Sequence, residues 1–387
     1  MIRDTVAFLR HNGIKALLAA EQAVKKAGGA KVTGNLFDCE CKYVGSDVKI
    51  ISETGDSTFI AKMNPDGTVN GGGFKILVTT DLHLLSDAEK RNKTLRLLCR
   101  QIADVKPDLV IFTGDVVLTD CQQIDAIQFG NLMEKMGVYW AYIFGNHEAR
   151  EEKEFHKYFL MKNFASFPHC LSKIGDERLF GYGNFFINIM GAENKLLQSL
   201  CFLDSGRDIC DYYRAEYNIP EDMKGYDFIK RNQMYFYENN IKSLREKYGD
   251  FKSMLFIHIP LPEYREVMEL DGNGGRPTGR AKVLYGHLYE EVGCSEYNSG
   301  MFDKILELGS TQAVFAGHDH VNDFCAEYKG VHLVYAQCGG YDQYTMGDNF
   351  GTPEKDWPQG ATIVDIGPDG SAEYRQRFNR IYLDPAD

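Results

Sequence analysis

The sequence predicts an α/β fold in which two packed β-sheets are flanked by helices. From residue 75 onward, short apolar segments alternate with segments of helical periodicity, as expected of strands joined by helices. The later apolar segments are separated by turns instead, which favours mixed sheets over a purely parallel one. The expected strands cover residues 76–80, 109–113, 139–144, 254–257, 313–316, 333–336 and 361–366.

Two helices are expected between the first three of these strands. Leu95, Leu98 and Ile102 have the spacing of one helix face, and Ile124, Ile127 and Met136 suggest the second helix. Because each helix connects two apolar strands, this part of the chain predicts neighbouring strands within one sheet.

The chain divides into an N-terminal extension, residues 1–73, and a main domain, residues 74–387. Residues 1–28 have helical periodicity, residues 48–62 suggest a hairpin, and three glycines at 71–73 resemble a linker. We expect the extension to pack on the main domain. Two long inserts are expected in that domain, at about 149–253 and 262–300, and the second is either a lid beside the site or a surface loop.

Charge and cysteine usage limit the classes of function. A net charge of −12 argues against an extended nucleic-acid-binding surface, which needs a basic patch. No apolar segment is long enough to predict a membrane span, and the N-terminus does not resemble a signal peptide. The ten cysteines form no CxxC pair, so we expect reduced thiols and a cytoplasmic protein.

The most informative residues follow the expected strands directly. Five short motifs lie at these strand ends, and together they supply carboxylates, a carboxamide and half of the ten histidines. The motifs are Asp81-Leu82-His83, Gly114-Asp115, Gly145-Asn146-His147-Glu148, His258 and Gly317-His318-Asp319-His320. Each histidine alone would suggest a structural role, but the set has the ligand types needed to hold two metal ions.

Two adjacent metal ions suit the hydrolysis of a phosphoester. A water molecule between them loses a proton to become the attacking hydroxide, and each ion neutralises charge on the phosphoryl group. Strand ends hold such ligands firmly and leave one side of the site open. In extended chain, the alternate spacing would place Asp81 and His83 on one side, and likewise His318 and His320.

The ordered motifs resemble those of the calcineurin-like metallophosphoesterase superfamily, whose pattern is DxH, GD, GNH(D/E), H and GHxH. The resemblance covers residues 81–320 and implies a four-layer αββα sandwich with mixed sheets. It implies one metal at Asp81, His83 and His320, a second at Asn146, His258 and His318, and Asp115 as the bridge between them. It also implies that His147 contacts the phosphate and acts as general acid.

Within the superfamily, the segments around Trp140, Phe256 and Gly317 are most similar to a branch related to purple acid phosphatases. These phosphatases have a tyrosine ligand in GDxxY, and the corresponding residue here is Leu118. The tyrosinate–iron bond is therefore not expected. We expect His83 to take its coordination position.

The resulting hypothesis is a phosphomonoesterase for small phosphoester substrates that uses two manganese, iron or zinc ions. A phosphodiesterase acting on cyclic nucleotides or other small diesters is the alternative enzyme, and a non-catalytic scaffold is an alternative of another class. Arg150 is a candidate contact for a phosphate oxygen. Oligomeric state is left open.

Overall fold

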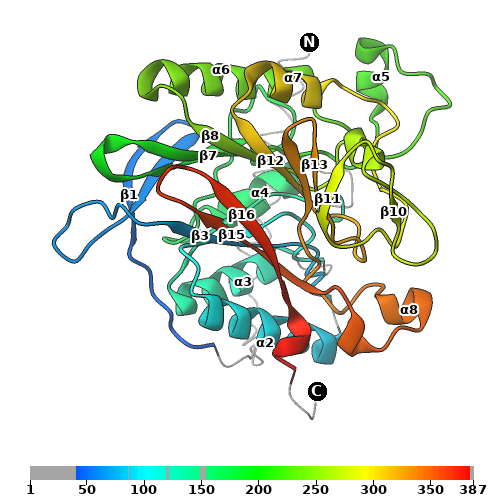
Figure 1. Cartoon of the computed structure of the whole chain (residues 1–387), viewed down its shortest axis with the longest axis horizontal. Helices are drawn as coiled ribbons and strands as arrows, with labels where there is room; N and C mark the ends of the chain where they lie inside the picture. The colour runs from blue at the N-terminus through cyan, green and yellow to red at the C-terminus, as the bar shows by residue number, and fades with distance from the viewer. Residues whose placement is uncertain (1–40, 86, 119–121, 149–153, 384–387) are drawn as a thin grey trace, which may run out of the picture. The chain divides into compact units, whose positions relative to one another are not determined.

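Two mixed β-sheets pack face to face, with helices on their outer faces (Figure 1). The computed structural model describes residues 41–85, 87–118, 122–148 and 154–383. Within these residues, strands of each sheet pair both parallel and antiparallel. The predicted four-layer αββα arrangement with mixed sheets is confirmed.

The larger sheet has nine strands in the described part of the chain. In spatial order they are β1 (Val48–Thr54), β2 (Ser57–Lys62), β6 (Phe185–Met190), β7 (Leu196–Phe202), β8 (Lys252–Phe256), β12 (Thr311–Ala316), β14 (Val331–Tyr335), β13 (Cys325–Tyr328) and β11 (Lys282–Tyr285).

The smaller sheet has five strands, and a separate two-stranded ribbon lies between β8 and β11 in the sequence. The five strands, in spatial order, are β16 (Ala372–Phe378), β15 (Gly360–Ile366), β3 (Phe74–Thr79), β4 (Leu109–Phe112) and β5 (Tyr139–Tyr142). The ribbon consists of β10 (Arg276–Pro277) and β9 (Met268–Glu269).

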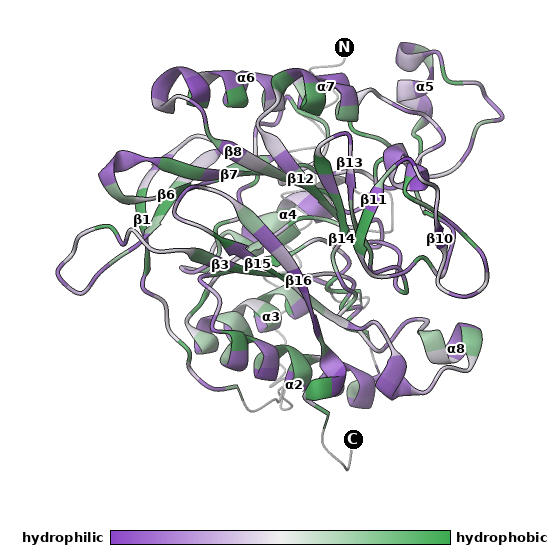
Figure 2. Cartoon of the chain, in the orientation of Figure 1, coloured by the Kyte–Doolittle hydropathy of each residue, from purple (hydrophilic) through white to green (hydrophobic). Residues whose placement is uncertain are grey.

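The helices form the outer layers. They are α2 (Ala88–Val105), α3 (Gln122–Met136), α4 (Glu154–Phe164), α5 (Asp211–Tyr217), α6 (Arg231–Tyr248), α7 (Met301–Leu308) and α8 (Met346–Phe350). Helices α2 and α3 lie on the five-stranded sheet, and α6 and α7 lie on the nine-stranded sheet (Figure 1). In Figure 2, α6 is largely hydrophilic with hydrophobic patches, as expected of a helix with one buried face.

Helix α2 begins and ends as its sequence directs. The Asp87 side chain accepts hydrogen bonds from the backbone N–H of Glu89 at 3.0 Å and of Lys90 at 3.2 Å, which caps the first turn. Lys106 ends the helix in the left-handed conformation, with φ of 49°. The predicted face of α2 is buried, and the second expected helix is confirmed as α3, in which Met136 is buried whereas Ile124 and Ile127 are exposed.

A stacked row of phenylalanines forms the centre of the layer between the sheets. Phe185, Phe202, Phe256 and Phe315 come from the neighbouring strands β6, β7, β8 and β12, and their ring centroids are 4.5, 5.0 and 4.9 Å apart in that order. Alternate residues of β8 face opposite sides of the sheet, so Phe256 lies in this layer while Leu255 packs with residues of α6. Burial of each phenylalanine contributes about 1.5–3 kcal/mol.

The strands on either side of residue 73 belong to the two packed sheets. Strands β1 and β2 precede residue 73 and lie in the nine-stranded sheet, and β3 follows it and lies in the five-stranded sheet. Strands β1 and β2 form the expected hairpin, and β2 pairs parallel with β6 in the larger sheet. Residues 149–253, predicted as an insert, contribute β6 and β7 to that sheet. The helical segment predicted at 1–28 lies outside the described residues, so the domain boundary at residue 73 stays a prediction.

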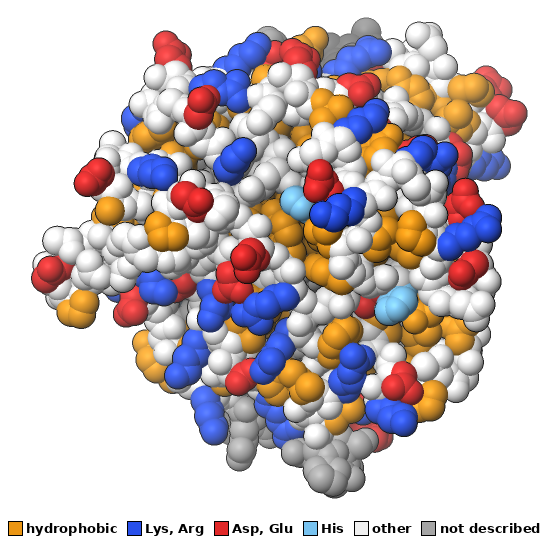
Figure 3. Space-filling model, viewed as in Figure 1, with side chains coloured by type: hydrophobic (Ala, Val, Ile, Leu, Met, Phe, Trp, Pro, Cys, Tyr) orange, Lys and Arg blue, Asp and Glu red, His pale blue; other side chains and the backbone are white. Residues whose placement is uncertain are grey.

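Other properties of the described residues bear on the expected location of the protein. Eight of the cysteines lie among them, and all eight are free thiols. No helix in this part of the chain has the length and apolar character needed to cross a membrane. On the face drawn in Figure 3, acidic and basic side chains are interspersed.

Candidate functional site

The predicted ligands lie together where strands of both sheets end. Parallel strands β3, β4 and β5 end just before Asp81, Asp115 and Asn146. In the larger sheet, the parallel strands β8 and β12 end just before His258 and His318. The carboxyl ends of parallel strands meet at one edge of a sheet, and packing of the two sheets brings these edges together.

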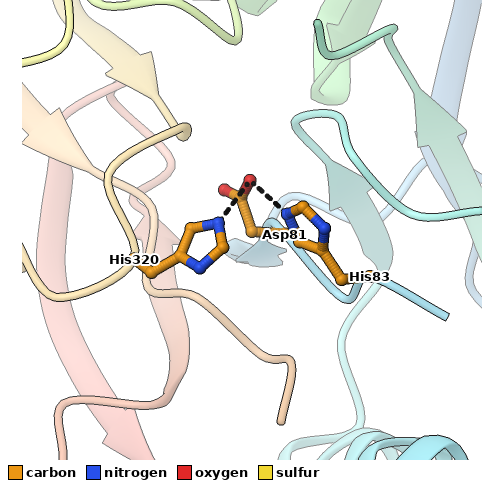
Figure 4. A group of neighbouring side chains, drawn as sticks. All are labelled: Asp81, His83 and His320. Carbon is orange, nitrogen blue, oxygen red and sulfur yellow. Dashed lines mark hydrogen bonds and ion pairs between the residues drawn. The ribbon is translucent and has the colours of Figure 1, made fainter. Parts of the chain in front are cut away.

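One group of side chains converges on the Asp81 carboxylate. Its Oδ1 lies 3.3 Å from Nε2 of His83 and 3.5 Å from Nε2 of His320. Figure 4 shows the carboxylate between the two imidazole rings. All three residues are buried, and one ligand atom of each lies within 4.8 Å of the other two, close enough for the three to surround one metal ion.

A second group converges on the Asn146 carboxamide. Its Oδ1 lies 2.9 Å from Nε2 of His258 and 2.9 Å from Nδ1 of His318. The Nδ1 of His258 lies 2.7 Å from the carbonyl oxygen of Thr113, to which it can donate a hydrogen bond. This contact directs Nε2 of His258 toward Asn146 and leaves it free to bind an ion.

Asp115 lies between the two groups. Its Oδ2 is 3.4 Å from Nε2 of His258, 3.7 Å from Nε2 of His83 and 3.9 Å from Nε2 of His147. The same oxygen is fully buried yet receives no hydrogen bond of regular geometry from the described residues. A buried acceptor without a donor is costly unless a cation or water satisfies it, so this site fits a bound metal.

Burial and the charges of neighbouring histidines keep two imidazoles neutral, which is the form that binds a metal ion. Burial lowers the pKa of His83 to about 4, and burial together with the charge of His258 lowers the pKa of His318 to about 3. Burial opposes the charged form of His258 as well, but the charges of Asp115 and Asp81 raise its pKa to about 10. A metal ion would therefore displace a proton from His258.

The backbone at the site departs from the extended conformation on which the alternation argument depends. Asp81, His83, Asp115 and His318 have φ of 51°, 42°, 52° and 79°, in the left-handed region. The argument from extended chain is therefore wrong, although Asp81 and His83 do meet. His318 and His320 belong to different groups, as the family resemblance implies.

Glycine is required where the two sheets approach each other. A Cβ at Gly114 would lie 2.5 Å from Nδ1 of His258 and 2.7 Å from the backbone nitrogen of Gly145. The φ of Gly114 is 104°, which side-chain-bearing residues rarely adopt. The glycine of the second motif thus permits the close packing of three ligand-bearing segments.

Glu148 connects two of these segments. Its carboxylate accepts hydrogen bonds from the backbone N–H of Gly145 at 2.7 Å, Asp115 at 2.9 Å and Val116 at 2.5 Å. Burial and the nearby charge of Asp115 raise the pKa of Glu148 to about 7. The motif alone gave no indication of this role, because two of the three donors, Asp115 and Val116, follow a different strand.

Three other residues named from the sequence are His147, Arg150 and Asp319. The His147 ring borders the cavity beside the cluster, and its backbone N–H donates to Oδ1 of Asp115 at 2.8 Å. Arg150 lies outside the described residues. Asp319 is buried and accepts hydrogen bonds from Tyr335, Asn322 and Gly293, so its carboxylate is engaged away from the two groups.

Two tyrosines pack against the predicted ligands. The ring of Tyr344 stacks on His320, with centroids 4.2 Å apart and planes 5° apart. The ring of Tyr226 meets His318 edge-on at 4.3 Å. Tyr226 lies in the long segment at 149–253, which has no recognisable motif, and no sequence signal distinguishes it from other tyrosines.

Comparison with known proteins identifies the family of this chain. Residues 74–322 match the model of the calcineurin-like phosphoesterase family. A protein of Arabidopsis thaliana named "Probable inactive purple acid phosphatase 29" is 31% identical over 310 residues, which cover 70% of this chain and 73% of that protein. Phosphatase DCR2 of Saccharomyces cerevisiae is 28% identical over 277 residues, covering 66% of this chain and 45% of that protein.

A solved structure shows the same fold. The dimetal phosphatase from Danio rerio superposes with a TM-score of 0.50 over 79% of this chain and 96% of that chain, at 12% identity. At that identity the likeness concerns the fold alone. The matched family model and the Arabidopsis relative show that this chain belongs to the calcineurin-like phosphoesterase family, and with the yeast phosphatase the family model identifies it as a phosphoester hydrolase.

Proposed function

We propose that this chain is a phosphomonoesterase for small substrates and works with two bound metal ions. The proposed ligands are Asp81, His83 and His320 for one ion, Asn146, His258 and His318 for the other, and Asp115 for both. When bound, the metal pair would polarise the phosphoryl group and lower the pKa of the attacking water.

The position of Asp115 is the observation that carries this proposal. Its Oδ2 has no regular hydrogen-bond donor among the described residues and faces His83 of one group and His258 of the other. A shared carboxylate fixes the spacing of two cations. A single structural ion would bind only one of the two groups of ligands and would not explain the other. Two binding sites therefore explain the buried residues better than one.

The donor set narrows the choice of metal. Imidazole nitrogens together with carboxylate and carboxamide oxygens suit manganese, iron or zinc, and the described site includes no thiolate ligand that would favour soft metals. We propose one of these three for each position.

His147 is proposed to act on the leaving group. Its side chain is 27% exposed and borders the cavity, whereas the predicted ligands beside it are buried. An imidazole at this position can hold a proton at Nε2 and donate it to the departing oxygen. Arg150 stays a predicted contact for a phosphate oxygen.

The cavity supports a small substrate. It has a volume of about 460 Å³ and is bordered by His83, His147, His318 and His320. Pockets of roughly 300–1,000 Å³ accommodate small molecules, and most of a small ester could be enclosed here.

Turnover of two model esters tests the proposal. Protein stripped with a chelator is reloaded with manganese, iron or zinc and assayed with nitrophenyl phosphate and bis-nitrophenyl phosphate. We expect metal-dependent hydrolysis with preference for the monoester. The Asp115→Asn variant should lose activity and metal, whereas Asp365→Asn, which removes an exposed partner of Arg375, should retain both.

Other outcomes would contradict the proposal in distinct ways. Preference for the diester would replace the phosphomonoesterase assignment with a phosphodiesterase one. Tight binding of fewer than two metals per chain, with no turnover of either ester, would favour the scaffold hypothesis. Because the Arabidopsis relative is named "inactive", metal content and turnover have to be measured together.

A further inference from the structure

The wall of the cavity beside the predicted metal ligands contains charged side chains that the proposed reaction does not use. They come from three segments, one containing Lys224 and Tyr226, one containing Arg265, and one running from Glu290 to Glu296. A leaving group extending from a phosphoryl group at the ligand cluster would lie against these side chains. Their charges therefore determine which leaving groups the cavity favours.

Several of these charged groups already have a partner within the cavity wall. Arg265 Nη2 donates to Oε1 of Glu296 at 2.7 Å, and the charge of Glu291 acts on the same guanidinium. The carboxylate of Glu290 accepts hydrogen bonds from the hydroxyl of Tyr344 at 2.8 and 3.0 Å. These groups satisfy one another before any ligand binds.

Lys224 differs from them. Its side chain is exposed at the cavity, and it forms no hydrogen bond or ion pair with any residue that the structure describes. Carboxylates of Glu290, Glu291 and Glu296 line the same cavity, and Arg265 is paired with one of them, so the Lys224 ammonium is the group available to an anion on a ligand. An ammonium group on a long side chain can reach a ligand anion as a point charge.

The backbone that carries Lys224 is held in place by contacts on both sides. The backbone N–H of Ile209 donates to the carbonyl of Gly225 at 3.1 Å, and that of Asp227 donates to the carbonyl of Arg207 at 3.1 Å. The ring of Tyr226 packs edge-on against His318 at 4.3 Å. The position of Lys224 is thereby tied to a predicted metal ligand.

We propose that Lys224 is a specificity-determining residue that binds a second anionic group, on the leaving-group side of a small phosphomonoester. This inference rests on the proposed function, because it takes the phosphoryl group to be bound at the ligand cluster. It narrows the substrate class to phosphomonoesters with an additional negative charge.

Binding of two non-hydrolysable ligands of equal shape tests this inference. The manganese-loaded full-length protein is titrated by calorimetry with 4-carboxybenzylphosphonate and with 4-carbamoylbenzylphosphonate, which differ in charge but hardly in size. We expect the carboxylate to bind about 1.5- to fivefold more tightly, the range for one solvent-exposed ion pair. The Lys224→Gln variant should lose this preference, and Lys224→Glu should reverse it.

Two further variants serve as controls. Lys224→Arg should keep the preference, and so should Lys282→Gln, which removes an exposed lysine of β11 that does not line the cavity. Equal affinities for the two ligands, no binding of either, or a preference that survives in Lys224→Gln would each overturn the inference.

Failure of the proposed function would give a different result. Turnover of the corresponding phenyl phosphates is measured on the same preparations. If a Lys224-dependent preference in binding persists while neither ester is hydrolysed, the phosphomonoesterase proposal is contradicted and the inference about Lys224 is supported. Hydrolysis of the esters without any charge preference would support the phosphomonoesterase proposal and contradict the inference about Lys224.

Discussion

The Glu148 carboxylate accepts a hydrogen bond from the backbone N–H of Asp115, with 2.9 Å between oxygen and nitrogen. The same carboxylate binds the N–H of Gly145, so the ends of β4 and β5 are fastened to each other below the predicted metal ligands. Asp115 holds its left-handed φ of 52° within this arrangement. Glu148 therefore positions Asp115, a predicted metal ligand, although Glu148 itself is not predicted to bind the metal.

We expect Glu148→Gln to reduce both stability and metal affinity. Glutamine keeps the shape but turns an N–H donor toward backbone N–H groups, which leaves at least one of them without an acceptor. The free energy of unfolding should fall by about 1–3 kcal/mol, as for other buried groups left unsatisfied. Urea unfolding and calorimetric titration with manganese measure the two effects.

A surface carboxylate provides the control for this experiment. Glu327→Gln changes an exposed residue of β13 and should alter neither quantity. If Glu148→Gln behaves like Glu327→Gln, the carboxylate does not hold the ligand segments, and the position of Asp115 must depend on other contacts.

We expect His147→Asn to slow the reaction without removing the metals. Loss of a general acid costs about 10²–10⁴ in kcat, and the cost is larger when the leaving oxygen is more basic. Phenyl phosphate should therefore suffer more than nitrophenyl phosphate. Steady-state kinetics with both esters and metal analysis of the purified variant measure these effects, with His169→Asn, in a surface pair with Glu134, as control. Equal losses for both esters would exclude a role in protonation.

Metal removal should lower thermal stability. Asp81 and Asp115 are both buried, and Oδ2 of Asp115 lacks a regular donor among the described residues, so a bound cation relieves repulsion and desolvation. An ion at 100 times its dissociation constant adds about 2.7 kcal/mol to the free energy of unfolding. Scanning calorimetry before and after chelation, and after manganese is restored, measures the shift. A melting temperature insensitive to chelator would argue against metal binding at these residues.

The sequence predicted the site where a ligand-type residue directly follows an apolar strand. An apolar run followed at once by a ligand residue identified the ends of β3, β4, β5, β8 and β12 to within about two residues. The same strands place Asp81, Asp115, Asn146, His258 and His318 together, because their carboxyl ends face one another.

Relationships between distant segments could not be predicted in this way. Strand β6 follows a long segment without motifs, and its parallel pairing with β2 depends on residues about 130 positions apart, as between Ser57 and Phe186. The residues that suggested α3 did not show which side of it is buried, because Ile124 and Ile127 are exposed whereas Phe129 and Met133 are buried. Lys224 reaches the cavity only through tertiary contacts.

A buried ion pair outside the site gives the last prediction. Lys230 forms an ion pair with Asp227, and both side chains are almost fully buried. The Lys230 ammonium also donates to the carbonyl of Phe228 at 3.0 Å and lies 3.5 Å from the centre of the Phe228 ring. This pair follows directly after the segment that carries Lys224, so we expect it to stabilise that wall of the cavity.

We expect Lys230→Met to destabilise the fold by about 3–5 kcal/mol, because an unpaired carboxylate is left in the interior. Burial already raises the pKa of Asp227 to about 6, even though Lys230 opposes the shift. A carboxyl group with a raised pKa in the folded state favours folding when protonated and loses that advantage as pH rises through its folded pKa. The variant should therefore regain stability as pH falls from 7.5 to 5.

Urea unfolding at these two pH values measures the effect. The double variant Asp227→Asn/Lys230→Met carries no buried charge at this pair and should be more stable at pH 7.5 than Lys230→Met alone. Lys242→Met, which removes the exposed partner of Glu238, should cost less than about 1 kcal/mol. If Lys230→Met costs no more than Lys242→Met, then Asp227 gains enough solvent or hydrogen bonds in the variant to remain charged, and the pair is not what fixes this wall.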